Sequence, residues 1–167
     1  MGKDILILGL GNDLLTDDRI GPKLVHDLKA GIVHPKVIFE TAAVGGLELI
    51  EIIRDYKQVM IIDAIKTPDG LAGSVYFLTP AEFRETSHLS NIHDISFLTA
   101  LHLAKKLHIE ITDDIRIIAV EIIEDRVFSE TFSPPVQEKY PEVFDTVKNY
   151  VLSWLGERLL KIGTKSG

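Results

Sequence analysis

The stretch "ILILGLGNDLLTDDRIGPKL", from Ile5 to Leu24, decides the fold expected of this chain. Its first apolar residues run into Gly-Leu-Gly, which is typical of a buried strand that leads into a phosphate-binding loop. Leu14, however, stands where the third glycine of a dinucleotide-binding motif should fall, and the adjacent carboxylates Asp17 and Asp18 follow. Because carboxylates repel phosphate groups, this loop is better suited to a cation than to a phosphate.

Short apolar runs alternate with longer helical patterns along the rest of the chain, as in a mostly parallel sheet covered by helices on both faces. The expected strands are residues 4–8, 36–41, 58–64, 73–78 and 114–122. The expected helices are residues 20–30, 47–56, 94–108 and 136–160. We therefore expect one α/β domain over residues 1–167, a three-layer α/β/α sandwich with a mostly parallel five-stranded sheet. Residues 58–64 are expected at its centre and residues 73–78 at an edge.

The composition excludes several classes of protein. The net charge of -7 argues against nucleic acid as a partner, because binding to its backbone requires clustered Lys and Arg. The absence of cysteine excludes thiol catalysis, disulfide scaffolds and thiolate metal sites. No apolar run reaches the roughly 18 residues of a membrane span, and the N-terminus does not read as a signal peptide. We expect a cytoplasmic monomer with no membrane partner.

Residues capable of chemistry follow three of the expected strands. Asp17 and Asp18 come after the first strand, Asp63 ends the third, and His93 lies just before the helix that follows the fourth. Ligands of such sheets bind at the carboxyl ends of the strands, so these residues are expected to converge at one edge. Two carboxylates and one imidazole suit a borderline divalent ion such as nickel or zinc.

Simpler interpretations exist for most of these residues. Asp17 or Asp18 could cap the helix that begins near residue 20. His93 could decorate the start of a helix, and His88, in the same loop, competes with it as a ligand. Asp63 is harder to explain in this way, because a carboxylate at the end of an apolar strand is costly unless it is paired or coordinated.

Two further carboxylates, Glu40 and Glu121, lie near the ends of the expected second and fifth strands. Either could flank the site, but we interpret both as solvated loop carboxylates. Glu40 also comes too late after Gly11 for the ribose contact of a dinucleotide-binding fold. The chain contains no Gly-Lys-Ser/Thr phosphate loop, no Gly-x-Ser-x-Gly elbow and no His-Glu-x-x-His pair. A Rossmann-like nucleotide-binding module remains an alternative.

Four segments in order resemble one family. "ILGLGNDLLTDDRIG" (residues 7–21) resembles the opening motif of the hydrogenase maturation proteases, endopeptidases that process the large subunit of nickel-iron hydrogenases. "GGLELIEIIRDYKQVMIIDAI" (45–65), "HDISFLTAL" (93–101) and "FSPPV" (132–136) resemble later segments of that family at matching spacing. The similarity covers nearly the whole chain.

The resemblance implies a metal site formed by Asp18, Asp63 and His93, with Asp18 and Asp63 as the catalytic carboxylates. It favours Asp18 over Asp17 and His93 over His88. This chain departs from the family at Arg19, where a glycine is common, which would alter the loop or the charge near the metal. It also lacks the proline often found after the last strand, in the segment "AVEIIED" (119–125).

The implied function is that of a cytoplasmic endopeptidase that removes the C-terminal extension of a hydrogenase large-subunit precursor after nickel insertion. The nickel would arrive with the precursor, which is the implied partner. Three other interpretations stay open: a nickel carrier with the same ligands, the nucleotide-binding module, and a related protease with another protein substrate, as among germination proteases.

Overall fold

The computed structural model describes residues 3–85 and 92–163 of the 167-residue chain, with side chains described for residues 4–82 and 97–160. Five strands form one sheet in the order β2-β1-β3-β5-β4. Their bounds are β1 Lys3–Leu10, β2 Val37–Ala42, β3 Tyr56–Ile65, β4 Val75–Leu78 and β5 Ile115–Glu121. β1, β2, β3 and β5 are parallel, and only β4 at the edge runs antiparallel to its neighbour. The mostly parallel sheet and its central strand are therefore as predicted.

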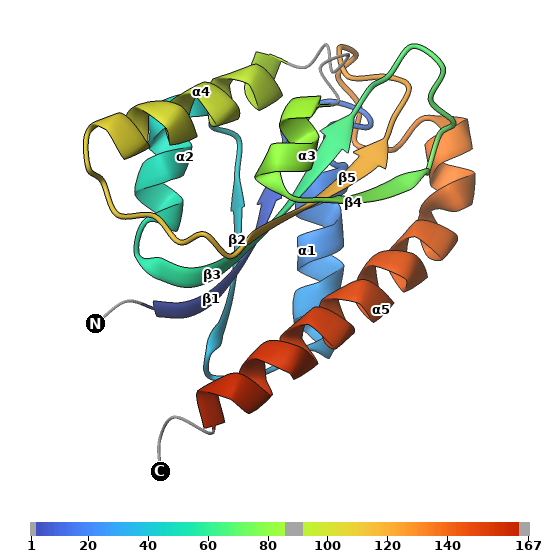
Figure 1. The fold of residues 1–167 in the computed structure, drawn as a ribbon. Coiled ribbons are helices and arrows are strands. Elements are labelled where there is room, and N and C mark those ends of the chain that lie inside the picture. The colour runs from blue at the N-terminus through green and yellow to red at the C-terminus, as the bar shows by residue number, and fades with distance from the viewer. Residues whose placement is uncertain (1–2, 86–91, 164–167) are drawn as a thin grey trace.

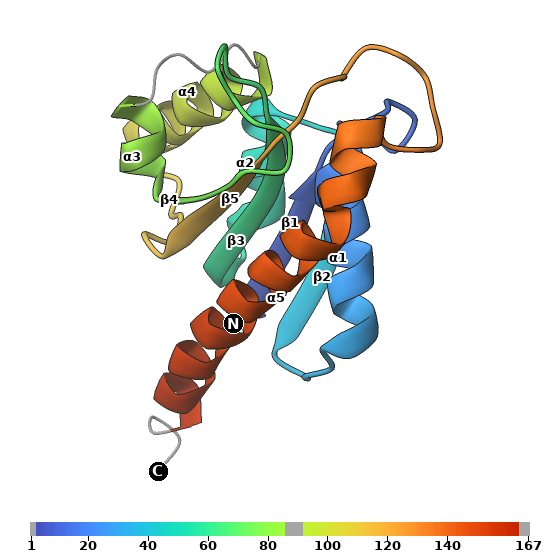
Figure 2. The same ribbon diagram turned by 90° about the vertical axis from the view of Figure 1, so that its right-hand side faces the viewer.

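Helices cover both faces of this sheet (Figure 1). α1 (Ile20–Gly31) and the long α5 (Pro134–Gly163) pack on one face, and α2 (Gly46–Ile53) and α4 (Ile92–Lys106) pack on the other (Figure 2). Side chains of β1 alternate between two hydrophobic cores: Ile5 and Ile7 face α1 and α5, whereas Leu6 and Leu8 face α2 and α4. A strand buried on both faces needs a continuous apolar run, which explains the sequence of β1. The three-layer α/β/α fold is confirmed.

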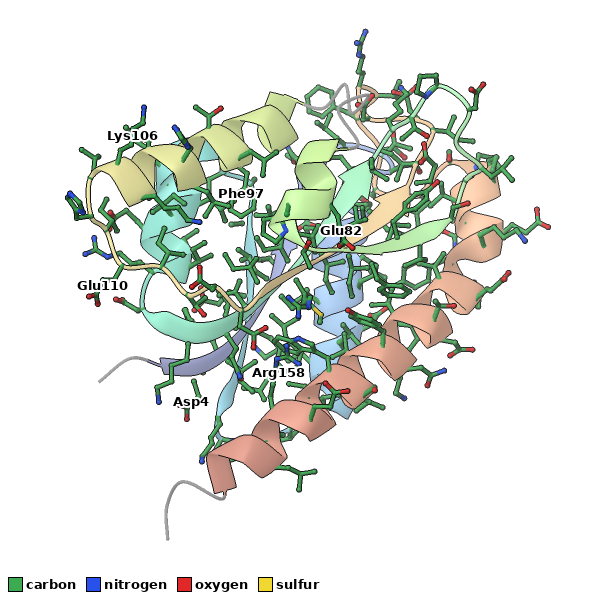
Figure 3. The ribbon with its side chains drawn as sticks, viewed as in Figure 1. Asp4, Glu82, Phe97, Lys106, Glu110 and Arg158 are labelled. Carbon is green, nitrogen blue, oxygen red and sulfur yellow. The ribbon has the colours of Figure 1, made fainter. Side chains whose placement is uncertain are left out.

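Two buried side chains attach helices to the sheet (Figure 3). Phe97 extends from α4 into the core between α4 and the sheet. Arg158 of α5 forms a two-pronged ion pair with Asp114, with nitrogen–oxygen distances of 2.6 and 3.0 Å, and lies 4.2 Å from the centroid of the Trp154 ring. Because Asp114 directly precedes β5, this pair fixes α5 against the end of the sheet opposite the strands' carboxyl ends.

Close backbone packing fixes the turn between β1 and α1. A Cβ atom at Gly9 would lie 2.6 Å from the carbonyl oxygen of Gly21, and a Cβ at Gly21 would collide with the carbonyl oxygens of Leu10 and Ile62. The first turn of α1 therefore sits directly against β1 and β3. Gly11 has a φ of 144°, a conformation that side-chain-bearing residues rarely adopt.

The structure also contains a short helix that was not among the expected elements, α3 (Pro80–Glu85). Its start is a capping box: the Thr79 amide donates to Glu82 Oε2 at 2.6 Å, and the Glu82 amide donates to Thr79 Oγ1 at 3.3 Å. The local signal was present as "TPAE", with proline in the first helical position. Across the described ranges, no helix combines the length and apolar character that crossing a membrane requires.

Candidate functional site

A small cavity of about 130 Å³ opens at the carboxyl edge of the parallel strands. Both predicted carboxylates, Asp18 and Asp63, line it. The other lining residues come from β1 with its following loop and from the loop after β2: Leu10, Gly11, Asn12, Leu15, Ala43 and Val44. Since β1 and β3 are adjacent and parallel, the segments that end them lie side by side, and the structure brings the two carboxylates together as expected.

Asp63 lies within β3 and not after it, because the strand continues to Ile65. Its side chain is only 9% exposed, and it follows Val59 and Ile61 on the sheet face covered by α2 and α4. Asp63 Oδ1 accepts a hydrogen bond of 2.8 Å from the amide of Ala64. A carboxylate placed in an otherwise apolar strand carries a desolvation cost that pairing or coordination must offset.

Asp18 is held by the loop that follows β1. The amide of Asn12 donates to Asp18 Oδ2 at 2.8 Å. The missing side chain of Gly11 allows this approach, because a Cβ there would collide with the carbonyl oxygen of Asp18. The Gly-Leu-Gly-Asn segment therefore presents a carboxylate to the cavity, where a phosphate loop would present amides to an anion.

Asp17 has a different environment from its neighbour. It is completely buried and accepts four hydrogen bonds: 2.7 Å from the amide and 2.7 Å from the hydroxyl of Ser133, 2.9 Å from the amide of Glu124 and 3.2 Å from that of Ile123. The interpretation of Asp17 or Asp18 as a helix cap is wrong, because the N-cap of α1 is Arg19 and has no side-chain capping bond. Asp17 instead ties its loop to the segment before α5.

The predicted third ligand lies outside the described side chains. α4 begins at Ile92, so His93 is in its first turn, on the helix that covers the sheet face of Asp63. His88 lies outside the described residues altogether. Among the residues whose side chains are described, no three His, Cys, Asp or Glu residues group closely enough to hold a metal ion. Of the three expected ligands, the structure therefore describes the side chains of Asp18 and Asp63 only.

The interpretation of Glu121 and Glu40 as solvated loop carboxylates is wrong. Glu121 is 1% exposed at the end of β5 and accepts hydrogen bonds from the amide and the hydroxyl of Thr67, at 2.6 and 3.0 Å. Glu40 lies inside β2 and accepts a hydrogen bond of 3.0 Å from the hydroxyl of Tyr56. Burial and this hydrogen bond raise the pKa of Tyr56 to about 12. Both carboxylates are parts of the fold, and neither lines the cavity.

Arg19 does not line the cavity either. Its guanidinium carbon lies 5.6 Å from the centroid of the Phe132 ring, and its Nε is buried without a hydrogen-bond partner. The side chain thus packs beside the segment that leads into α5. Arg19 therefore contributes to packing of the loop that carries Asp18.

The cavity disfavours a nucleotide. Its volume of about 130 Å³ is well below the roughly 300 to 1,000 Å³ of pockets that enclose small-molecule ligands. Two carboxylates in it would also repel a pyrophosphate. Carboxylate oxygens can instead bind a divalent cation or accept a proton from water.

Comparisons with known proteins agree with these observations. The profile of the HycI family, described as hydrogenase maturation protease, matches residues 22–149, a range that includes Asp63 and His93 and begins just after Asp18. The hydrogenase 2 maturation protease of Escherichia coli (strain K12) is 32% identical over 79 residues. That alignment covers 47% of this chain and 48% of the relative, about half the length of each.

Solved structures share the fold. The hydrogenase maturating endopeptidase HybD of E. coli superposes with a TM-score of 0.67 at 24% identity, covering 86% of this chain and 89% of that one. The [NiFe] hydrogenase maturation protease HycI of Thermococcus kodakarensis KOD1 superposes with a TM-score of 0.65 at 21% identity, covering 89% and 92%.

Proposed function

The chain belongs to the hydrogenase maturation protease family, and on that basis we propose that it is a cytoplasmic, monomeric endopeptidase. Its substrate is the large-subunit precursor of a nickel-iron hydrogenase, from which it removes the C-terminal extension after nickel insertion. One observation carries the proposal. Asp18 lies in the loop after β1, Asp63 lies near the end of the adjacent parallel strand β3, and both line one small cavity. Membership of the family and the donor chemistry of this pair support the same conclusion.

The carboxylates act on a metal that belongs to the substrate. Asp18 and Asp63, together with His93, complete the coordination of the precursor's nickel, for which carboxylate and imidazole groups are suitable ligands. Docking of the nickel positions the scissile carbonyl at the cavity. The partly solvated carboxylate of Asp18, held by the Asn12 amide, and the buried one of Asp63 then have fixed positions relative to that carbonyl.

The reaction is hydrolysis of one peptide bond. A water molecule adds its oxygen to the carbonyl carbon and gives up a proton to a carboxylate oxygen that is not bound to the metal. The proton passes to the departing amine as the carbon–nitrogen bond breaks. This step consumes one water molecule and needs no further reactant.

The test compares nickel-loaded and nickel-free precursor. Each is mixed with the purified protein, and the products are weighed by mass spectrometry. We expect loss of a C-terminal peptide only from the nickel-loaded precursor. Asp18→Asn and Asp63→Asn should abolish cleavage while the circular dichroism spectrum stays unchanged, and Asp13→Asn, an exposed change in the same loop, should cleave normally. Normal cleavage by Asp63→Asn would overturn the site assignment.

A further inference from the structure

Exposed apolar side chains gather on two paired loop segments beside the cavity. Leu14 is 59%, Val127 56% and Phe128 76% exposed. The Ser129 amide donates to the Leu14 carbonyl and the Thr16 amide to the Val127 carbonyl, both at 3.1 Å. Residues 14–16 and 127–129 thus form a short antiparallel pair, which we call the loop ribbon.

Several hydrogen bonds hold the loop ribbon in place, so the fold itself keeps its apolar side chains exposed. The Thr16 hydroxyl donates to the Val127 carbonyl at 2.5 Å, and the Asp17 amide donates to the Glu124 carbonyl at 2.9 Å. The buried carboxylate of Asp17 accepts hydrogen bonds from the successive amides of Ile123 and Glu124 and from the amide of Ser133. A loop held in this way keeps Phe128 in water at a hydrophobic cost that a partner can relieve.

Strand geometry places Phe128 on the cavity side of the loop ribbon. Leu15 and Phe128 form the bridge pair, and the hydrogen bonds lie on either side of this pair. In such a non-hydrogen-bonded pair the two side chains project to the same face and lie close together. Leu15 lines the cavity, so Phe128 extends the same apolar surface outward from its rim.

We propose that Leu15 and Phe128 form a docking surface for an extended apolar segment of the polypeptide substrate, next to the bond that reaches Asp18 and Asp63. This inference rests on the proposed function. The cavity, at about 130 Å³, has room for little more than one side chain or peptide group, so the flanking residues of a polypeptide must lie outside it. Among the residues whose side chains are described, Phe128 is an exposed apolar residue of the loop ribbon that continues from this lining through Leu15.

The test measures binding and cleavage separately. Binding is measured with a nickel-loaded large-subunit precursor whose scissile amide is replaced by a non-hydrolysable reduced bond, and the affinities of the unchanged protein and of Phe128→Ser for it are compared. We expect Phe128→Ser to weaken binding about tenfold, since an exposed aromatic side chain gains burial on docking. In the otherwise unchanged protein, Phe128→Ser should raise KM by a similar factor without changing kcat, and Phe128→Leu should restore most of the affinity.

Leu107→Ser is the matched control. Leu107 is 59% exposed and follows the carboxyl end of α4, so its change should affect neither binding nor KM. Undiminished binding by Phe128→Ser overturns the docking surface, as does a precursor that the unchanged protein neither binds nor cleaves. Binding that depends on Phe128 without cleavage by the unchanged protein would refute the proposed hydrolysis while supporting the docking surface.

Discussion

Asp17 and Ser133 share two hydrogen bonds of 2.7 Å, one from the Ser133 amide to Oδ1 and one from its hydroxyl to Oδ2. Ser133 directly precedes α5, and its carbonyl accepts a bond of 2.8 Å from the Gln137 amide of the helix's first turn. The pair therefore joins the loop after β1 to the start of α5. Asp18, the residue after Asp17, lines the cavity. The connection between Asp17 and Ser133 therefore holds in place the loop that carries Asp18.

Asp17→Asn should destabilise the protein by about 3 kcal/mol. The amide group of asparagine would place donors opposite the amides and hydroxyl that now donate to the carboxylate, and this position has no access to water. Urea unfolding measures the change in the free energy of unfolding. Asp13→Asn, an exposed change in the same loop, should stay within about 0.5 kcal/mol. An equally small change for Asp17→Asn would show that its bonds contribute little.

Gly11→Ala should lower stability by about 2 kcal/mol and abolish precursor processing. The φ of 144° disfavours any side chain, and the new Cβ would collide with the Asp18 carbonyl oxygen, which moves that carboxylate away from Asp63. Gly31→Ala serves as the control, because a Cβ there meets no atom within 4 Å. Alanine also restricts the unfolded chain more than glycine does, so this change at the last residue of α1 should not destabilise the protein. Thermal unfolding and the mass assay together measure both effects. Wild-type processing by Gly11→Ala would argue against a fixed position for Asp18.

Nickel titration distinguishes a protease from a nickel carrier. If the metal arrives with the precursor, the isolated protein should bind Ni²⁺ only weakly, because its ligands leave open positions for those of the substrate. Asp18→Asn and Asp63→Asn should weaken this binding further. Isothermal calorimetry measures it directly. Tight stoichiometric binding by the isolated protein, with no cleavage of any precursor, would favour the carrier.

The free energy of unfolding should decrease at alkaline pH because of Tyr56. The pKa of its hydroxyl is raised from 10.0 to about 12, first by burial and then by its hydrogen bond to Glu40. Between these two pH values the unfolded chain has lost the proton that the folded protein still holds, so the free energy of unfolding decreases as pH rises. Tyr56→Phe should be less stable at neutral pH and should lose less stability between about pH 8 and about pH 11. Urea unfolding at both pH values measures this. Parallel losses in the two proteins would exclude Tyr56 as the source.

Most of the fold was predictable because its signals are local. The continuous apolar runs of β1 and β3 identify strands buried on both faces, and the 3.6-residue periodicity of α1 identifies its inner side. α3 was missed although its capping box, Thr79 to Glu82, is equally local. The error on Glu121 has another cause: its partner Thr67 follows β3, far away in the chain, so the apolar residues around Glu121 do not show what pairs with its carboxylate.

The sequence by itself determined the order of the strands and of every helix except α3. It also determined the family resemblance and the candidates Asp18, Asp63 and His93, because each depends on residues close together in the chain or on a recognisable motif. Only the tertiary structure showed what the neighbouring carboxylate, Asp17, does. Asp17 accepts hydrogen bonds from residues 123, 124 and 133, and Asp18 lines the same cavity as Asp63. The exposure of Phe128 beside Leu15 was likewise decided by the pairing of two distant loops. Contacts of this kind arise from how layers pack, and no local pattern encodes them.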